Sequence, residues 1–182
     1  MRIAFIGQKG IPALSGGVEK YVEQVAKRMA AHGHQVTVYV RSNYTPVDRT
    51  EWEGVHLVHT PGIHTKHLDA ITCTFTAVVH ALFQPYDIVH FQSIGPSTLA
   101  WILKVLKRDT IVLATFHSID YLHQKWGWFA RTFLRLGGSG LGLHLSHCIC
   151  QHSGENIVFH TGDFFNRNWL AVSNGNLRAD FE

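Results

Sequence analysis

Met1-Arg-Ile-Ala-Phe-Ile-Gly7 begins the segment that decides the fold of this chain, residues 1–40. The apolar run within it has the length of a buried strand and ends in glycine. After a mixed loop, a glycine pair at positions 16 and 17 precedes apolar residues in steps of three and four. These are Val18, Tyr21, Val22, Val25, Ala26 and Met29. That spacing predicts a helix with one buried face.

The same segment continues into a second strand. Gly33 stands where a helix commonly ends in a left-handed residue, and Gln35-Val-Thr-Val-Tyr-Val40 follows as a β-type run. Strand, glycine-rich loop, helix and strand form a βαβ unit, whose crossover should be right-handed. Its first loop lies at the carboxyl end of a strand, where open α/β sheets bind ligands.

Alternation of strands and helices extends to residue 137. Further strands are expected at 54–59, 86–91 and 110–115, and helices at 67–83, 96–106 and 126–134. The helix at 67–83 is expected to bury its larger apolar residues: Leu68, Ile71, Phe75, Val78, Val79 and Leu82. This order predicts an α/β fold, a doubly wound parallel sheet with helices on both faces.

Loops that leave parallel strands open on one edge of the sheet. The loops after the first, fourth and fifth expected strands therefore place Gly16, Gly17, Ser93 and His117 in one potential cleft. The glycines fit neither the G-x-G-x-x-G dinucleotide pattern nor a Walker loop. A glycine pair at a helix start allows a phosphate or sugar to approach the backbone, although a turn that simply needs glycine is the alternative.

His117 follows a buried-type strand and precedes Ser118 and Asp120. A histidine there can hydrogen-bond a sugar hydroxyl or stabilise charge in a transition state. The alternative is a loop histidine without a role.

Composition limits the class of protein. With 46% apolar and 16% charged residues and a net charge of +3, the chain can form a core, and its charge does not argue for nucleic acid. Three cysteines do not suggest a disulfide framework, so a reducing cytosol is expected. We expect no signal peptide, because the apolar span from Arg2 to Gly7 is too short for one, and no run approaches the roughly 18 apolar residues of a membrane span.

Residues 138–182 differ from what precedes them. They contain no lysine or proline and carry a net charge of −2, against +5 for residues 1–137. Only short strands are expected, near 157–159 and 169–172. His144, His147, Cys148, Cys150 and His152 could hold zinc, but their spacing is not a common structural one. We expect an irregular, poorly ordered tail, and a small metal-binding protein is the least favoured reading.

Several blocks of residues 1–137 resemble the amino-terminal domain of glycosyltransferase family 4, the retaining GT-B enzymes. The sequences that carry this resemblance are Gly7-Gln-Lys-Gly-Ile-Pro-Ala13, Gly16-Gly17-Val-Glu19, Gly33-His-Gln-Val-Thr-Val-Tyr39, Thr65-Lys-His-Leu-Asp69, Tyr86-Asp-Ile-Val-His90, Ile94-Gly-Pro-Ser97, Phe116-His-Ser-Ile-Asp120, Lys125-Trp-Gly127 and Phe133-Leu-Arg-Leu-Gly137. Bacterial polysaccharide or rhamnosyl-type transferases are the most similar subgroup. The family commonly has Val-His-Gly where this chain has Phe116-His117-Ser118.

The resemblance implies one Rossmann-like half of a GT-B fold. It implies transfer of a sugar from a nucleotide-sugar, the co-substrate, to a glycan or lipid-linked acceptor, with retained anomeric configuration and without a metal or other cofactor. His117 is the expected catalytic residue near the transferred sugar. Gly16, Gly17, Ser93 and Asp120 are the expected substrate-binding residues. The implied location is the cytoplasm, with at most peripheral contact at the inner face of the membrane.

The family's second domain, which binds the nucleotide and supplies a glutamate-rich motif, has no counterpart in this sequence. The chain is therefore expected to be truncated and inactive alone, with residues 138–182 an out-of-frame or otherwise aberrant end. The alternative is a non-catalytic binding subunit that pairs with a separate carboxyl-terminal domain.

Overall fold

The computed structural model describes residues 1–63, 65, 68–117, 147–152, 155–157, 171–173 and 176–178. Most of its strands form one sheet in the order β3-β4-β2-β1-β5-β6-β7-β8. The strands are β1 (Arg2–Ile6), β2 (Gln35–Arg41), β3 (Glu51–Trp52), β4 (Val55–Thr60), β5 (Ile88–Gln92), β6 (Ile111–Phe116), β7 (His147–His152) and β8 (Glu155–Ile157). All neighbours from β4 to β7 are parallel, whereas β3 and β8 pair antiparallel at the two edges. Two further strands, β9 (Ala171–Ser173) and β10 (Asn176–Arg178), pair separately and antiparallel.

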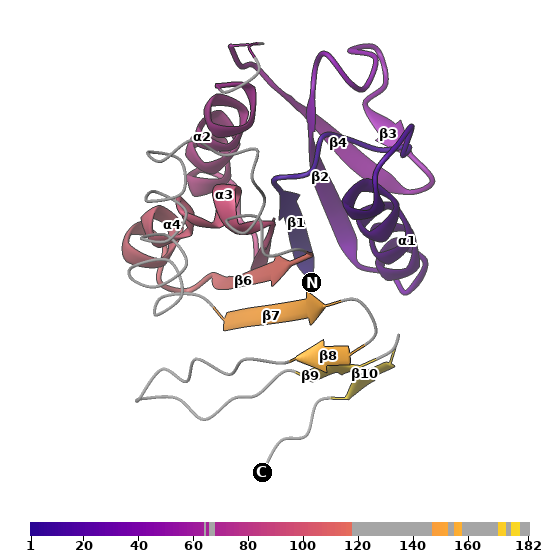
Figure 1. The fold of residues 1–182 in the computed structure, drawn as a ribbon, viewed down its shortest axis with the longest axis vertical. Coiled ribbons are helices and arrows are strands. Elements are labelled where there is room, and N and C mark those ends of the chain that lie inside the picture. Colours follow the sequence, from indigo (N-terminus) through magenta and orange to yellow (C-terminus); the bar gives the residue numbers. More distant parts are fainter. Residues whose placement is uncertain are drawn as a thin grey trace.

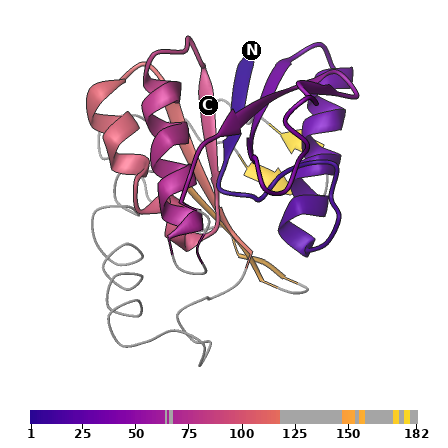
Figure 2. The same ribbon diagram turned by 90° about the horizontal axis from the view of Figure 1, so that it is seen from above.

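Helices cover both faces of this sheet. They are α1 (Gly17–Ala31), α2 (Asp69–Leu82), α3 (Ile94–Ser97) and α4 (Ala100–Leu106). Figures 1 and 2 show α1 on one face, and α2 and α4 together on the other. The doubly wound α/β fold expected from the sequence is therefore confirmed.

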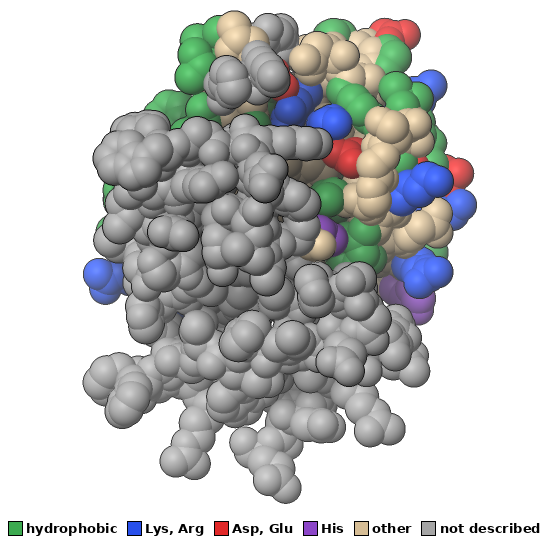
Figure 3. Space-filling model, viewed as in Figure 1, with side chains coloured by type: hydrophobic (Ala, Val, Ile, Leu, Met, Phe, Trp, Pro, Cys, Tyr) green, Lys and Arg blue, Asp and Glu red, His purple; other side chains and the backbone are tan. Residues whose placement is uncertain are grey.

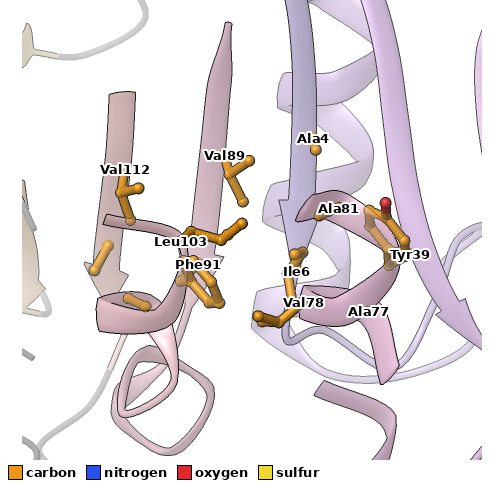
Figure 4. Packing of buried hydrophobic residues seen from close by; sticks show 12 residues of the cluster. Ala4, Ile6, Tyr39, Ala77, Val78, Ala81, Val89, Phe91, Leu103 and Val112 are labelled. Atoms are coloured by element: carbon orange, nitrogen blue, oxygen red, sulfur yellow. The ribbon is translucent and has the colours of Figure 1, made fainter. Parts of the chain in front are cut away.

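Strand β1 lies at the centre and contributes to both halves of the core. Its alternating side chains direct Ala4 and Ile6 toward α2 and α4, and Ile3 and Phe5 toward α1. Figure 4 shows the first of these clusters, in which Ile6 of β1 lies beside Val78 of α2. Arg2 at the start of β1 is exposed, but the four residues after it are at most 3% exposed, so both faces of this part of the strand are covered.

Helix α1 has the ends that the sequence predicts. It begins at the glycine pair and ends before Gly33, which has φ +83°. The Gly33 N–H donates to the Ala30 carbonyl at 2.9 Å, and the His34 N–H donates to the Met29 carbonyl at 3.2 Å. These bonds use carbonyl groups that would otherwise end the helix without partners.

The buried face of α2 differs from the prediction. The structure buries mainly small side chains, which are Cys73, Thr74, Ala77, Val78 and Ala81. Ile71, Phe75 and Val79, expected inside, are 38%, 51% and 38% exposed. Small residues allow the helix backbone to approach the sheet closely, and this advantage outweighs the burial of the larger side chains.

Strand β7 falls within the expected irregular tail, where the sequence predicted no strand at residues 147–152. It pairs with β6 through Leu113↔His147 and Ala114↔Cys148. Strands β8 and β9 overlap the two short strands that were expected there. The helix expected at 126–134 lies outside the described residues, and the domain boundary at residue 137 stays a prediction.

Candidate functional site

The loop after β1 makes close contact with the end of β5. Gly7 has φ +113°, and a Cβ atom there would lie 2.5 Å from the Gln92 carbonyl oxygen and 2.8 Å from the Pro96 side chain. Only glycine fits both this backbone conformation and this space. Gly7 therefore brings the loop after β1 into close contact with the loop after β5. Both loops lie at the carboxyl edge of the sheet, which is the edge where the parallel strands end.

The glycine pair at the start of α1 divides into two different environments. Gly16 has φ +96°, and a Cβ atom there would collide with the carboxylate of Glu19. Glu19 is buried, and its Oε1 accepts the N–H of Lys9 at 3.2 Å. A Cβ atom on Gly17 would meet nothing within 4 Å. Gly16 is thus required by the turn, whereas Gly17 leaves open space at the first turn of the helix.

Ser93 follows β5 in a conformation that is rare for a residue other than glycine, with φ 72° and ψ 159°. Its N–H donates to the Thr115 carbonyl at 2.8 Å, which continues the pairing of β5 with β6. Its own carbonyl accepts the Ser97 hydroxyl at 2.7 Å. These bonds hold Ser93 in place despite the backbone strain.

His117 lies immediately beyond β6 and contacts two elements. Its Nε2 is 2.7 Å from Oε1 of Gln92, the last residue of β5. Its ring meets the Tyr21 ring of α1 edge to face, with centroids 4.9 Å apart. The imidazole is therefore held by a contact with Gln92 of the sheet and by a contact with Tyr21 of α1.

Beneath His117 the sheet face toward α1 carries buried polar side chains. Nε2 of His90 lies 2.6 Å from Oγ1 of Thr115, and both residues are buried. Burial, with a smaller contribution from the nearby charge of His117, lowers the pKa of His90 to about 3, so His90 is neutral at physiological pH. Burial also raises the pKa of Tyr21, and a hydrogen bond with Thr115 partly opposes that effect.

A small pocket of about 10 Å³ lies farther along the carboxyl edge, at the ends of β1, β2 and β4. The Arg41 guanidinium lines it and donates to Asp69 of α2 at 2.7 Å, with both side chains about one-seventh exposed. The pocket has room for one water-sized sphere. None of the predicted site residues lines it.

The structure brings some of the predicted site residues together. His117 contacts Tyr21, one turn into the helix that Gly16 and Gly17 begin, and Ser93 is bonded to the strand that ends beside His117. Asp120 lies outside the described residues. Whether any of these residues binds a substrate stays a prediction.

Sequence reasoning missed Gln92, Thr115 and His90, which surround or underlie His117. A signal was present, because polar residues at positions 90 and 92 alternate within an otherwise apolar buried strand.

For metal binding, no group of three or more candidate ligands occurs among the residues that the structure describes. The zinc alternative falls mostly in β7, whose side chains are outside that description; its residues there are His147, Cys148, Cys150 and His152.

On the face shown in Figure 3, Lys and Arg side chains are scattered among acidic and uncharged ones rather than gathered in one patch. Within the described part of the chain, no helix has the length and apolarity needed to cross a bilayer.

Comparisons with known proteins bear on the family and the fold. Residues 15–153 match the family model described as Glycosyltransferase Family 4. Among solved structures, the chain resembles the sucrose-phosphate synthase (tll1590) of Thermosynechococcus elongatus, with a TM-score of 0.54 and 19% identity. That similarity covers 74% of this chain and 39% of the synthase, and at this identity it shows the fold alone. A comparison with curated proteins found no match.

Proposed function

The chain belongs to glycosyltransferase family 4, and we propose that it forms the amino-terminal wall of a GT-B sugar-transfer cleft. The reaction would move a sugar from a nucleotide-sugar to a glycan or lipid-linked acceptor with retention of the anomeric configuration. The observation that carries this proposal is the carboxyl edge near His117, where the ends of β5 and β6 and helix α1 meet. Ligands of open α/β sheets bind at this edge.

His117 is the proposed catalytic residue, placed near the transferred sugar. A sugar hydroxyl would form a hydrogen bond with the imidazole, and Ser93 and Asp120 would bind substrate from the neighbouring loops. His117 is partly exposed, unlike the buried histidine beneath it. A partly exposed ring held from two sides can meet a ligand without first rearranging.

Gly17 would allow the ligand to approach the first turn of α1. The positive end of a helix dipole favours anions, but the buried Glu19 carboxylate beside Gly16 opposes that attraction. Neutral hydroxyl groups of a sugar or glycan are therefore a better fit at this helix start than the donor phosphates. The phosphates would be bound mainly by a second domain, in keeping with the chain's coverage of only 39% of the synthase.

The test measures sugar transfer and donor hydrolysis by the full chain, alone and mixed with a family carboxyl-terminal domain, using uridine, guanosine and thymidine diphosphate sugars. We expect turnover only in the mixture. Robust turnover by the chain alone would overturn the need for a second domain. Acceptor binding without turnover in any mixture would instead support the binding-subunit alternative.

Gly17→Val provides a sharper test, because a Cβ atom at this exposed position would meet nothing within 4 Å. We expect the variant to fold normally and to lose at least tenfold in kcat/KM. Lys20→Val, on the exposed surface of the same helix, is the matched control and should retain activity. Equal activity of Gly17→Val and the wild type would remove the glycine pair from the site.

A further inference from the structure

The side chain of Gln92 is fully buried at the end of β5, although an apolar residue would suit that position better. A buried carboxamide is unfavourable unless it makes hydrogen bonds. Its Oε1 lies 2.7 Å from Nε2 of His117, and its own Nε2 has no hydrogen-bond partner among the residues that the structure describes. Packing therefore does not account for this residue, and its contact with His117 calls for another explanation.

The parallel register explains how the two residues meet. Gln92 of β5 pairs with Thr115 of β6, and His117 lies two residues beyond Thr115. Successive side chains alternate between the faces of a strand, so positions two apart share a face. Tyr21 then contacts the imidazole from α1, with an interplanar angle of 66°. One polar contact and one aromatic contact thus limit rotation of the ring.

The carboxamide also selects one form of the imidazole. A carboxamide oxygen can only accept a hydrogen bond, so the Nε2 that faces it must carry the hydrogen. In a neutral ring, Nδ1 is then the acceptor. Among the residues that the structure describes, two titratable groups lie beside this ring: His90, whose low pKa keeps it neutral, and Tyr21, whose raised pKa keeps it protonated. Neither adds a charge at neutral pH.

We propose that Gln92 is a positioning residue that holds His117 in its Nε2–H tautomer and orients the ring toward a sugar bound at the carboxyl edge. This proposal rests on the proposed function for its substrate, whereas the tautomer itself is a property of the free chain.

The first experiment records long-range proton–nitrogen correlations of the histidine rings in the ¹⁵N-labelled full chain above pH 7. Signals of His117 are assigned by their loss in His117→Asn. We expect the Nε2–H form in the wild type, and a mixture of both tautomers in Gln92→Leu and Gln92→Met. Two variants are used because one may pack better than the other in the space that the carboxamide leaves.

The matched control is Gln8→Met. Gln8 is also a buried glutamine at the carboxyl edge, but its Nε2 donates to the Phe5 and Tyr39 carbonyls rather than contacting His117. The His117 tautomer should be unchanged in this variant. An Nδ1–H form in the wild type, or an unaltered tautomer in a folded Gln92 variant, would overturn the proposal.

Gln92→Glu tests the same contact by replacing the neutral carboxamide with a negatively charged carboxylate. A carboxylate at this distance stabilises the imidazolium, so the pKa of His117 should rise by at least one unit relative to the wild type. An unchanged pKa would show that the two side chains do not interact in solution.

A second readout separates this inference from the proposed function. In the two-domain mixture, Gln92→Met should reduce kcat by at least tenfold with a smaller change in KM, because the ring remains present but is not oriented. If no mixture transfers sugar, the proposed function fails while the tautomer measurement still decides whether Gln92 positions the ring. If transfer occurs and Gln92→Met retains the wild-type kcat, the positioning role fails alone.

Discussion

His90 and Thr115 lie on neighbouring parallel strands with Nε2 of the imidazole 2.6 Å from Oγ1 of the hydroxyl, and both side chains are buried. The bond gives each of these two buried side chains a polar partner. It also leaves the imidazole in surroundings that strongly disfavour its protonated form. Stability should therefore depend on pH through this residue.

Between about pH 6.5 and pH 3, His90 is protonated in the unfolded chain but neutral in the native chain. The unfolded state binds the extra proton, so His90 makes the free energy of unfolding fall as pH decreases through this window. The loss is about 1.4 kcal/mol per pH unit. We expect His90→Gln, which can still bond Thr115, to have a flatter profile in urea titrations from pH 7 to pH 4. Carboxyl groups such as Asp87 titrate in both proteins and cancel in the comparison, and parallel profiles would contradict the prediction.

Ser93 should favour glycine over alanine, because its φ of 72° with ψ of 159° suits a residue without Cβ. We expect Ser93→Gly to be more stable than Ser93→Ala by about 1 kcal/mol in chemical denaturation. Gln24, exposed within α1, is the control with the opposite preference, since alanine is favoured there by about 1 kcal/mol. The same order at both positions would show that Ser93 is not strained.

Gly7 and Gly17 should respond very differently to alanine. Gly7→Ala places Cβ against the Gln92 carbonyl and Pro96 in a left-handed backbone, so we expect a loss of about 2 kcal/mol or more in thermal or urea unfolding. Gly17→Ala enters open space at the start of a helix and should be neutral or slightly stabilising. Equal effects would mean that the loops after β1 and β5 do not make the close contact described above.

The Arg41–Asp69 ion pair should contribute measurably to stability, because both side chains are largely buried and their atoms are 2.7 Å apart. A double-mutant cycle with Arg41→Met and Asp69→Asn should give a coupling of about 2 kcal/mol. The pair between Lys27 and Glu53 is nearly half exposed and should couple by less than about 1 kcal/mol. A coupling at Arg41–Asp69 no greater than at the exposed pair would contradict this prediction.

The doubly wound α/β fold could be predicted because the first forty residues contain a complete βαβ pattern, and similar strands recur at regular intervals. The buried face of α2 could not be predicted by ranking hydrophobicity. Phe75 has more apolar area than Ala77, yet Phe75 is 51% exposed whereas Ala77 is buried in the core cluster. Which side of a helix faces the sheet is decided by packing in the assembled fold, and this overrides the preference of an individual side chain.

For the candidate site, the sequence was sufficient to predict that His117 follows a strand, but it did not identify Gln92 as the residue that His117 contacts. Gln92 and His117 are 25 positions apart, and they meet only because β5 and β6 are adjacent and in a particular register. The sequence also gave no means of separating the roles of Gly16 and Gly17. That difference depends on the position of the Glu19 carboxylate in the folded turn.

The central position of β1 has a consequence for synthesis of the chain on the ribosome. Its two neighbours are β2, completed at residue 41, and β5, completed at residue 92. After β2 is complete, some fifty further residues must therefore be synthesised before the second edge of β1 is covered. During that interval the nascent chain presents an apolar strand edge, which favours aggregation and gives a chaperone a surface to protect.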